Sequence, residues 1–227
     1  MSKLKLSRFR ALEKRELTLR RKFLLWDTNA HRFGNPSPDE IRAYCVLFHA
    51  EIEAYVEDIA KDGIEYSKAL LRDKNVANGV LFSLVAGMHD VFGDQIISGD
   101  DRLSASRSLK PKSKLEWVDL CGKQGHQIIA SNHGIKEENI VRMFRPLGVD
   151  LGALDALWLA EMTQMGAARG NIAHDTLKIQ SVPNLSDLKA RVDLIMKGCE
   201  DLRKAMLTVC KATVPATVAL AGAATIL

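Results

Sequence analysis

The chain has 227 residues, of which 47% are hydrophobic and 26% are charged, so it can bury a sizeable core and is not generally disordered. Its net charge of +4 is compatible with a nucleic-acid partner but does not require one. Aromatic residues make up only 6%, which favours helices because strands are enriched in aromatic and β-branched residues.

The first 36 residues are expected to form a basic N-terminal helix that precedes the main domain. Residues 3–22 hold nine basic side chains and two acidic ones, which is compatible with RNA binding and equally with a solvated surface. The predicted helix covers residues 4–33 and ends at Gly34-Asn35-Pro36, since glycine and proline interrupt helices.

Residues 37–212 are expected to form one helical domain, which opens with a clear helix start. Ser37 is placed as the N-cap, Pro38 as the first helical residue and Glu40 as the third position of a capping box. Apolar residues then recur at steps of three and four from Ile41 to Ile59, as on one face of a long helix.

The remaining apolar periodicity predicts helices over residues 75–89, 114–132, 137–144, 151–176 and 186–209, the last capped by Ser186. Residues 98–114 break this pattern and are predicted to be a long loop. No stretch shows strand alternation, so we expect an all-α fold with no β-sheet. Residues 213–227 form an uncharged tail that is short for a membrane span, which needs about 20 residues.

The four cysteines indicate reduced thiols in a cytoplasmic protein. They are widely spaced, form no C-x-x-C pair and complete no zinc-ligand pattern with the six histidines, so we expect no metal and no cofactor. The basic N-terminus has no apolar stretch behind it and does not look like a secretory signal, and no membrane partner is expected.

The segment that could carry chemistry is Arg169-Gly170-Asn171-Ile172-Ala173-His174. An arginine and a histidine five residues apart are common by chance. Both could simply stabilise a helix end, where basic side chains interact favourably with the helix dipole, and Asp175 could pair with either.

Three segments in order give this motif more weight. They are 41–56 (IRAYCVLFHAEIEAYV), 134–140 (GIKEENI) followed by 145–148 (RPLG), and 169–174 (RGNIAH). Together they resemble the HEPN superfamily, in particular its RiboL-PSP-type branch, whose signature is R-x4–6-H. The resemblance spans about residues 41–211. It implies an antiparallel helical bundle that forms a homodimer and acts as a metal-independent RNase, commonly as a toxin or in antiviral defence, with an antitoxin or another defence-system protein as a partner.

Two positions depart from the family pattern. Members often have Asn or Asp directly after the arginine, whereas this chain has Gly170 there and places the amide one residue later, at Asn171. Some toxin members carry a tyrosine two residues after the histidine, where this chain has Thr176, so regulation through that tyrosine does not carry over.

The chemistry of the motif suits a site shared by two chains. Five helical steps of about 100° place Arg169 and His174 about 140° apart, so one helix does not bring them together, whereas two copies around a two-fold axis would. Arginine can hold a phosphate through two hydrogen bonds, and histidine can transfer a proton near neutral pH. We therefore take Arg169, His174 and Asn171 as the candidate catalytic residues, acting on RNA whose own 2′-hydroxyl is the nucleophile.

Other residues are expected to support this site. Glu51 and Glu53 are candidates for orienting its side chains, although an acidic surface pair is as good an interpretation. Arg102, Arg107 and Lys110, here called the basic loop, are expected to bind RNA phosphates. Two alternatives remain open, namely a non-catalytic HEPN module that binds RNA or protein, and a purely structural helical oligomer.

Overall fold

The computed structural model describes residues 6–94, 114–174 and 183–215. In chain order the elements are α1 (Leu6–Phe23), α2 (Pro38–Lys74), β1 (Val76–Asn78), α3 (Gly79–Asp94), α5 (Lys114–Ala130), α6 (Glu137–Phe144), two short 3-10 helices (Arg145–Leu147 and Leu151–Ala153), α7 (Ala156–His174), α8 (Leu185–Lys211) and β2 (Thr213–Pro215).

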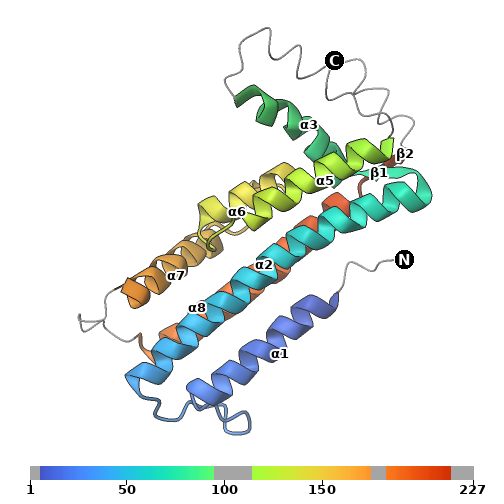
Figure 1. The fold of residues 1–227 in the computed structure, drawn as a ribbon. Coiled ribbons are helices and arrows are strands. Elements are labelled where there is room, and N and C mark those ends of the chain that lie inside the picture. The colour runs from blue at the N-terminus through green and yellow to red at the C-terminus, as the bar shows by residue number, and fades with distance from the viewer. Residues whose placement is uncertain (1–5, 95–113, 175–182, 216–227) are drawn as a thin grey trace.

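The helices α2 and α8 lie side by side along the middle of the molecule (Figure 1). Helix α1 runs along one side of α2, and α5, α6 and α7 cover another side. Helix α7 contacts α2, α6 and α8, so the helix that carries residues 169–174 is held by three neighbours. The expected all-α helical bundle is confirmed.

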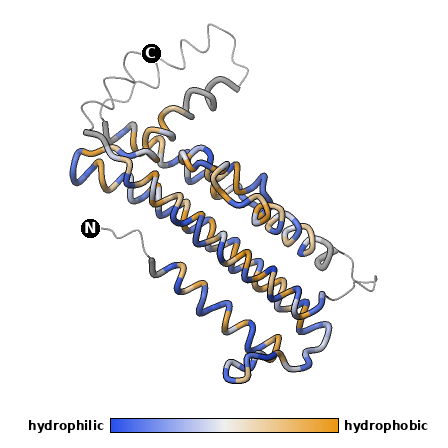
Figure 2. The backbone as a smooth tube through the Cα atoms, turned by 180° about the vertical axis from the view of Figure 1, so that it is seen from behind, coloured by the Kyte–Doolittle hydropathy of each residue, from blue (hydrophilic) through white to orange (hydrophobic). Residues whose placement is uncertain are grey.

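Most buried apolar side chains form one cluster between these layers. Hydrophobic residues recur along α2 and α8, where the two helices pack against each other and their neighbours (Figure 2). The N-terminal segment takes part in the same cluster through Leu12, Leu19 and Leu24. The division of the chain at residue 36 stays a prediction.

A single glycine sets how closely α7 approaches α8. The indole ring of Trp158, on α7, lies against Gly198, on α8, and a Cβ added at Gly198 would lie 2.1 Å from Trp158 Cγ. Trp158 is fully buried, so its ring has nowhere to move. The absence of a side chain at Gly198 therefore permits this close packing.

The predicted start of α2 is confirmed. Ser37 accepts a hydrogen bond from the Glu40 backbone N–H, and the Glu40 carboxylate accepts one from the Ser37 backbone N–H at 2.7 Å. Pro38 occupies the first turn, as expected. The helix ends only at Lys74, where Asn75 adopts a left-handed conformation with φ of 52°.

The N-terminal helix is shorter than predicted, because it ends at Phe23 and not near residue 33. Leu25 follows in a left-handed conformation with φ of 52°. The Asp27 carboxylate then accepts the backbone N–H groups of Asn29 and Ala30, which stabilises a turn in place of further helix.

Three other boundaries also differ from the prediction. The helix expected from residue 75 begins at Gly79, after the short strand β1. That strand pairs antiparallel with β2, with three residues in each strand. The two strands are too short to show an alternating pattern in the sequence, so this pairing of distant segments was not predicted. The helix expected from residue 151 begins at Ala156. The N-cap of α8 is Asn184 and not the predicted Ser186, because the Asn184 side chain accepts a hydrogen bond from the Ser186 N–H at 2.8 Å.

None of the helices within the described residues is both long and apolar enough to cross a membrane. The predicted loop over residues 98–114 lies outside the described residues, apart from Lys114, and so do residues 216–227 of the uncharged tail.

Candidate functional site

The three segments that resemble the HEPN superfamily come together around Glu53, on α2. The backbone N–H of Gly134, in the second segment, lies close enough to the Glu53 carboxylate to lower the pKa of Glu53. Arg169, in the third segment, is close enough to stabilise the charge of Glu53. Gly134 has φ of 144°, a conformation that disfavours any side chain, so a glycine is suited to this approach. Segments that are far apart in the sequence therefore share one site.

Arg169 lies in the last part of α7 and its side chain is exposed. Within the described part of the chain, Arg169 forms no ion pair and no hydrogen bond through its guanidinium group. Its charge nevertheless acts on two neighbours on α2, since it contributes to the pKa values of His49 and Glu53. A guanidinium held near the surface in this way can bind an external anion such as a phosphate.

His49 is a buried residue of this site that the sequence interpretation did not select. The residue is 3% exposed, and burial, reinforced by the positive charge of Arg169, lowers the pKa of His49 from 6.5 to about 4. His49 Nδ1 lies 3.9 Å from Glu53 Oε2. Because its pKa is lowered, His49 is neutral at physiological pH. Its spacing of four residues from Glu53 on one helix was a signal in the sequence, because such residues face the same side.

Glu53 has a raised pKa, for several physical reasons that compete. Burial raises it most, and the nearby carboxylate of Glu57 adds to that effect. The positive charge of Arg169, the neighbouring His133 and the N–H of Gly134 act in the opposite direction. The site thus combines one exposed cation with a partly buried acid and a buried neutral imidazole.

Glu51 lies on another side of α2 and not beside Glu53. Two helical steps of about 100° separate the two side chains by about 160°. Glu51 accepts a hydrogen bond from Arg15 Nε, on α1, at 2.7 Å. The structure therefore places Glu53 beside Arg169, whereas Glu51 joins α2 to α1.

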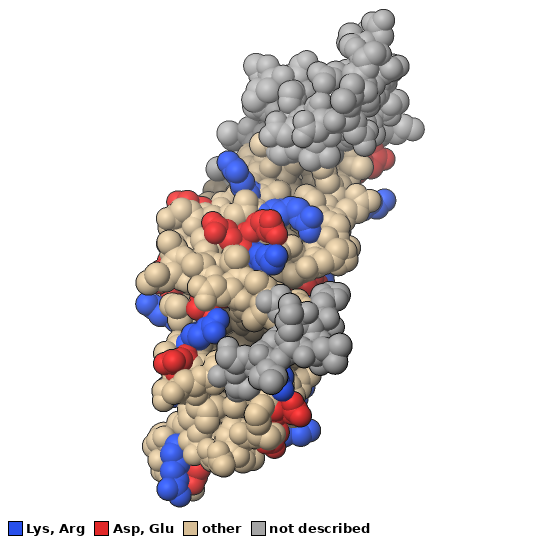
Figure 3. All heavy atoms as spheres, turned by 90° about the vertical axis from the view of Figure 1, so that its left-hand side faces the viewer, with Lys and Arg blue, Asp and Glu red and all other residues tan. Residues whose placement is uncertain are grey.

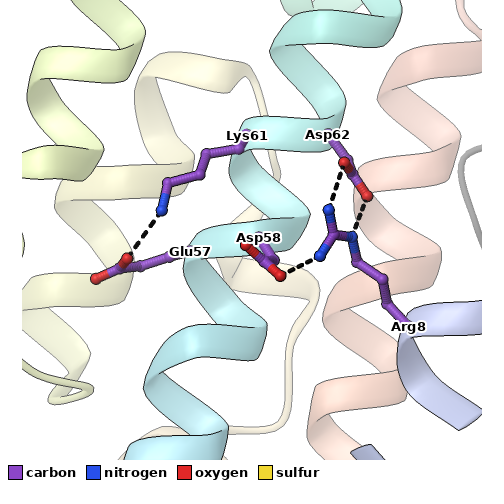
Figure 4. Close-up of polar contacts among 5 residues, drawn as sticks. All are labelled: Arg8, Glu57, Asp58, Lys61 and Asp62. Atoms are coloured by element: carbon purple, nitrogen blue, oxygen red, sulfur yellow. Dashed lines mark hydrogen bonds and ion pairs between the residues drawn. The ribbon is translucent and has the colours of Figure 1, made fainter. Parts of the chain in front are cut away.

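Arg15 is one of several basic side chains of α1 that bind acidic residues of the bundle. Arg8 reaches from α1 to Asp58 and Asp62 of α2, while Glu57 and Lys61 pair on a different side of α2 (Figure 4). Basic and acidic side chains are interspersed on the described surface that Figure 3 presents. Much of the positive charge of α1 is therefore locally compensated, which weakens the case for α1 as an RNA guide.

The other predicted site residues are placed only in part. Asn171 and His174 belong to the last turns of α7, but their side chains lie outside what the structure describes. The basic loop lies entirely outside the described residues. Among the residues that are described, no three His, Cys, Asp or Glu side chains are grouped so that they could hold a metal ion.

Comparison with known families supports the resemblance on which these segments were chosen. A sequence model of RiboL-PSP-HEPN matches residues 20–208, well over half of the chain. The chain belongs to the RiboL-PSP-HEPN family. It has no match among curated proteins or solved structures. The match to RiboL-PSP-HEPN includes all three converging segments and begins within α1.

Membership of the RiboL-PSP-HEPN family supports an RNA-related role. HEPN domains are often RNases, and they commonly bind RNA and form dimers. Within this RiboL-PSP-HEPN member, Arg169 is an exposed cation, and His49 and Glu53 are its neighbours on α2.

Proposed function

We propose that the protein is a metal-independent endoribonuclease of the HEPN type, which cleaves RNA by attack of the 2′-hydroxyl at a site shared by two protomers. The observation that carries this proposal is the meeting of three family segments around Glu53, with Arg169 exposed and in no ion pair with a described acid. A phosphate would be the natural ligand of such an arginine.

In the proposed reaction, Arg169 binds the scissile phosphate and stabilises the charge that develops on it. A histidine, His174, removes the proton from the 2′-hydroxyl, or protonates the departing 5′-oxygen, and the second His174 of the dimer performs the other transfer. The 2′-oxygen forms a bond to phosphorus as the bond to the 5′-oxygen breaks. The products are a 2′,3′-cyclic phosphate and a 5′-hydroxyl, and in this proposal Asn171 contacts the phosphate group.

The outer face of α7 supports the dimer that this reaction needs. Leu157, with 70% of its surface exposed, begins a stripe of exposed, mostly small residues that continues through Ala160, Gln164 and Ala168. One further turn in the same register reaches Asn171. A two-fold contact along this stripe would bring the two motifs together, since the motif is part of the same helix.

The catalytic proposal is tested by RNA degradation with wild-type protein and the variants His174→Ala and Arg169→Lys. General acid–base catalysis typically contributes about 10²–10⁴-fold, so His174→Ala should nearly abolish cleavage while the fold and dimer persist. Arg169→Lys should also cleave poorly, because lysine offers a point charge in place of a planar fork.

Two further arms test the mechanism. Cleavage should continue in EDTA, and a substrate with a 2′-deoxy group at the cut position should resist. Equal cleavage of the 2′-deoxy substrate, or loss of activity with the chelator, would contradict the mechanism. RNA binding without any cleavage would instead support a non-catalytic HEPN module. Gly170 stands directly after Arg169, where family members often have Asn or Asp, and this departure gives the non-catalytic alternative some weight.

The dimer is tested by light scattering with Leu157→Glu, which places a charge on the exposed stripe of α7. Leu25→Glu is the matched control, because Leu25 is the other large apolar side chain described as exposed and lies in the loop after α1. Leu157→Glu should give monomers without activity, and Leu25→Glu should stay dimeric and active. A wild-type monomer at micromolar concentration would refute the shared site.

The biological role that we propose is that of a toxin or antiviral defence protein, controlled by an antitoxin or another defence-system protein. Expression of the wild-type chain in bacteria should arrest growth, and the His174→Ala chain should not. A neighbouring gene whose product relieves the arrest would identify the partner.

A further inference from the structure

A cavity of about 280 Å³ lies beside Arg169, between α2, α7 and α8. Apolar side chains from all three helices form its walls, among them Ile41, Phe48, Met165, Leu188, Val192 and Ile195. Its α2 side also includes Tyr44, whose ring is stacked on that of Phe48 with centroids 5.7 Å apart. The reaction proposed above makes no use of this space.

Positive charge surrounds the same cavity. Arg42 on α2, Arg169 on α7 and Arg191 on α8 all line it, against one acidic residue, Glu161. Glu161 is bound to Arg191, and Arg42 is bound to Asp39. Asp39 and Glu161 offset two of the three arginines, so Arg169 leaves one net positive charge beside an apolar interior.

An apolar hollow lined by cations matches the two halves of a nucleotide. The base has apolar faces and a hydrogen-bonding edge and can leave the stack and enter a pocket, while the phosphates of the nucleotide need positive partners. The volume of about 280 Å³ is at the lower end of small-molecule pockets, which typically measure about 300–1,000 Å³. It therefore suits a single base better than a larger ligand.

We propose that this cavity receives one unpaired nucleobase of the RNA next to the phosphate held by Arg169. This inference rests on the function proposed above and names its substrate class, single-stranded RNA. A base inside a duplex cannot enter the cavity unless it first leaves its pair and its stack. Arg42 and Arg191 would then contact the flanking phosphates.

The chain carries its own probe for this proposal. Cys45 lines the cavity and is partly exposed, whereas Cys121, Cys199 and Cys210 are buried. Alkylation of Cys45 by N-ethylmaleimide, followed by mass spectrometry on the full chain, reports whether the cavity is filled. The three buried thiols act as an internal control, because they should react only if the protein unfolds.

The first arm of the experiment uses AMP, CMP, GMP and UMP, with ribose 5-phosphate and inorganic phosphate for comparison. At saturation, at least one nucleotide should slow the alkylation of Cys45 about tenfold or more, and the two ligands without a base should not. If no nucleotide protects better than ribose 5-phosphate, the base pocket is refuted.

The second arm separates RNA from a free nucleotide as the source of the base. Random single-stranded 2′-O-methyl hexamers, which cannot supply the attacking hydroxyl, should protect Cys45, and duplexes of the same length should not. Protection by mononucleotides alone would overturn the assignment to RNA. Arg42→Gln and Arg191→Gln should weaken the protection by hexamers, and Arg72→Gln, at the exposed far end of α2, should leave it unchanged.

The outcomes also separate this inference from the proposed function. RNA cleavage without any protection of Cys45 would refute the pocket and leave the endoribonuclease intact. Protection by single-stranded hexamers without cleavage of unmodified RNA would support the pocket and refute the catalytic assignment. Met165→Trp, which fills the cavity, should remove the protection by nucleotides, while the buried thiols confirm that the variant is folded.

Discussion

The buried imidazole of His49 should make the protein lose stability in mild acid. The folded protein binds a proton at His49 only near pH 4, whereas the unfolded chain binds it near pH 6.5. As the pH falls through this window, the unfolded state takes up a proton that the folded state does not. The free energy of unfolding therefore decreases as the pH is lowered.

The size of this effect follows from the two pKa values. A tenfold difference in proton affinity is worth about 1.4 kcal/mol, so the loss between pH 8 and pH 4.5 should be about 2–3 kcal/mol. Glu53, whose pKa is raised, acts in the opposite direction, because it takes up its proton more readily in the folded state. The comparison of wild type with a His49 variant removes this and other background contributions.

The assay is urea unfolding of wild type, His49→Leu and His31→Leu at several pH values between 8 and 4.5. His49→Leu should lose about 2–3 kcal/mol less than wild type over this range. His31→Leu is the control for a histidine-to-leucine change outside the core, since this histidine is exposed in the loop after α1. A His49→Leu protein that loses stability as steeply as wild type would refute the reasoning.

Three further outcomes are expected. Gly198→Ala should destabilise the protein by about 1–3 kcal/mol or more, because the new Cβ would meet Trp158. Gly170→Ala should instead stabilise it by about 0.5–1 kcal/mol, because a Cβ at Gly170 has no described atom within 4 Å. Urea unfolding measures both changes, and equal effects would contradict the packing argument. Ser37→Ala should cost about 1 kcal/mol in the same assay through loss of the capping box, and no loss would mean that the cap is not stabilising. Reversing the charges of the basic loop should flatten the salt dependence of RNA binding. An unchanged salt dependence would mean that the loop does not bind RNA and is a solvated linker.

Local interactions made the helices predictable from the sequence. The capping box of Ser37 and Glu40 involves residues three apart, and α6 begins and ends at the predicted residues, Glu137 and Phe144. Such features depend on neighbours in the chain, so the residue pattern contains them. The family could likewise be inferred from the order of its three segments along the chain.

Features that depend on distant segments could not be predicted in the same way. The pairing of β1 with β2 joins Val76–Asn78 to Thr213–Pro215, which are far apart in the chain. The sequence interpretation took Glu51 and Glu53 together, and the structure separates them, with Glu51 bound to Arg15 and Glu53 near Arg169. The role of His49 and the cavity beside Arg169 became visible only when α2, α7 and α8 were placed together.

The short β1–β2 pairing has a practical consequence for attaching the protein to a surface. It holds the chain at Pro215 beside the start of α3, at the end of the molecule away from the C-terminal end of α7 (Figure 1). An anchor or fluorophore fused after this point would leave from the pole opposite Arg169. Immobilised protein should then keep its motif facing the solution, which suits single-molecule recording of RNA capture.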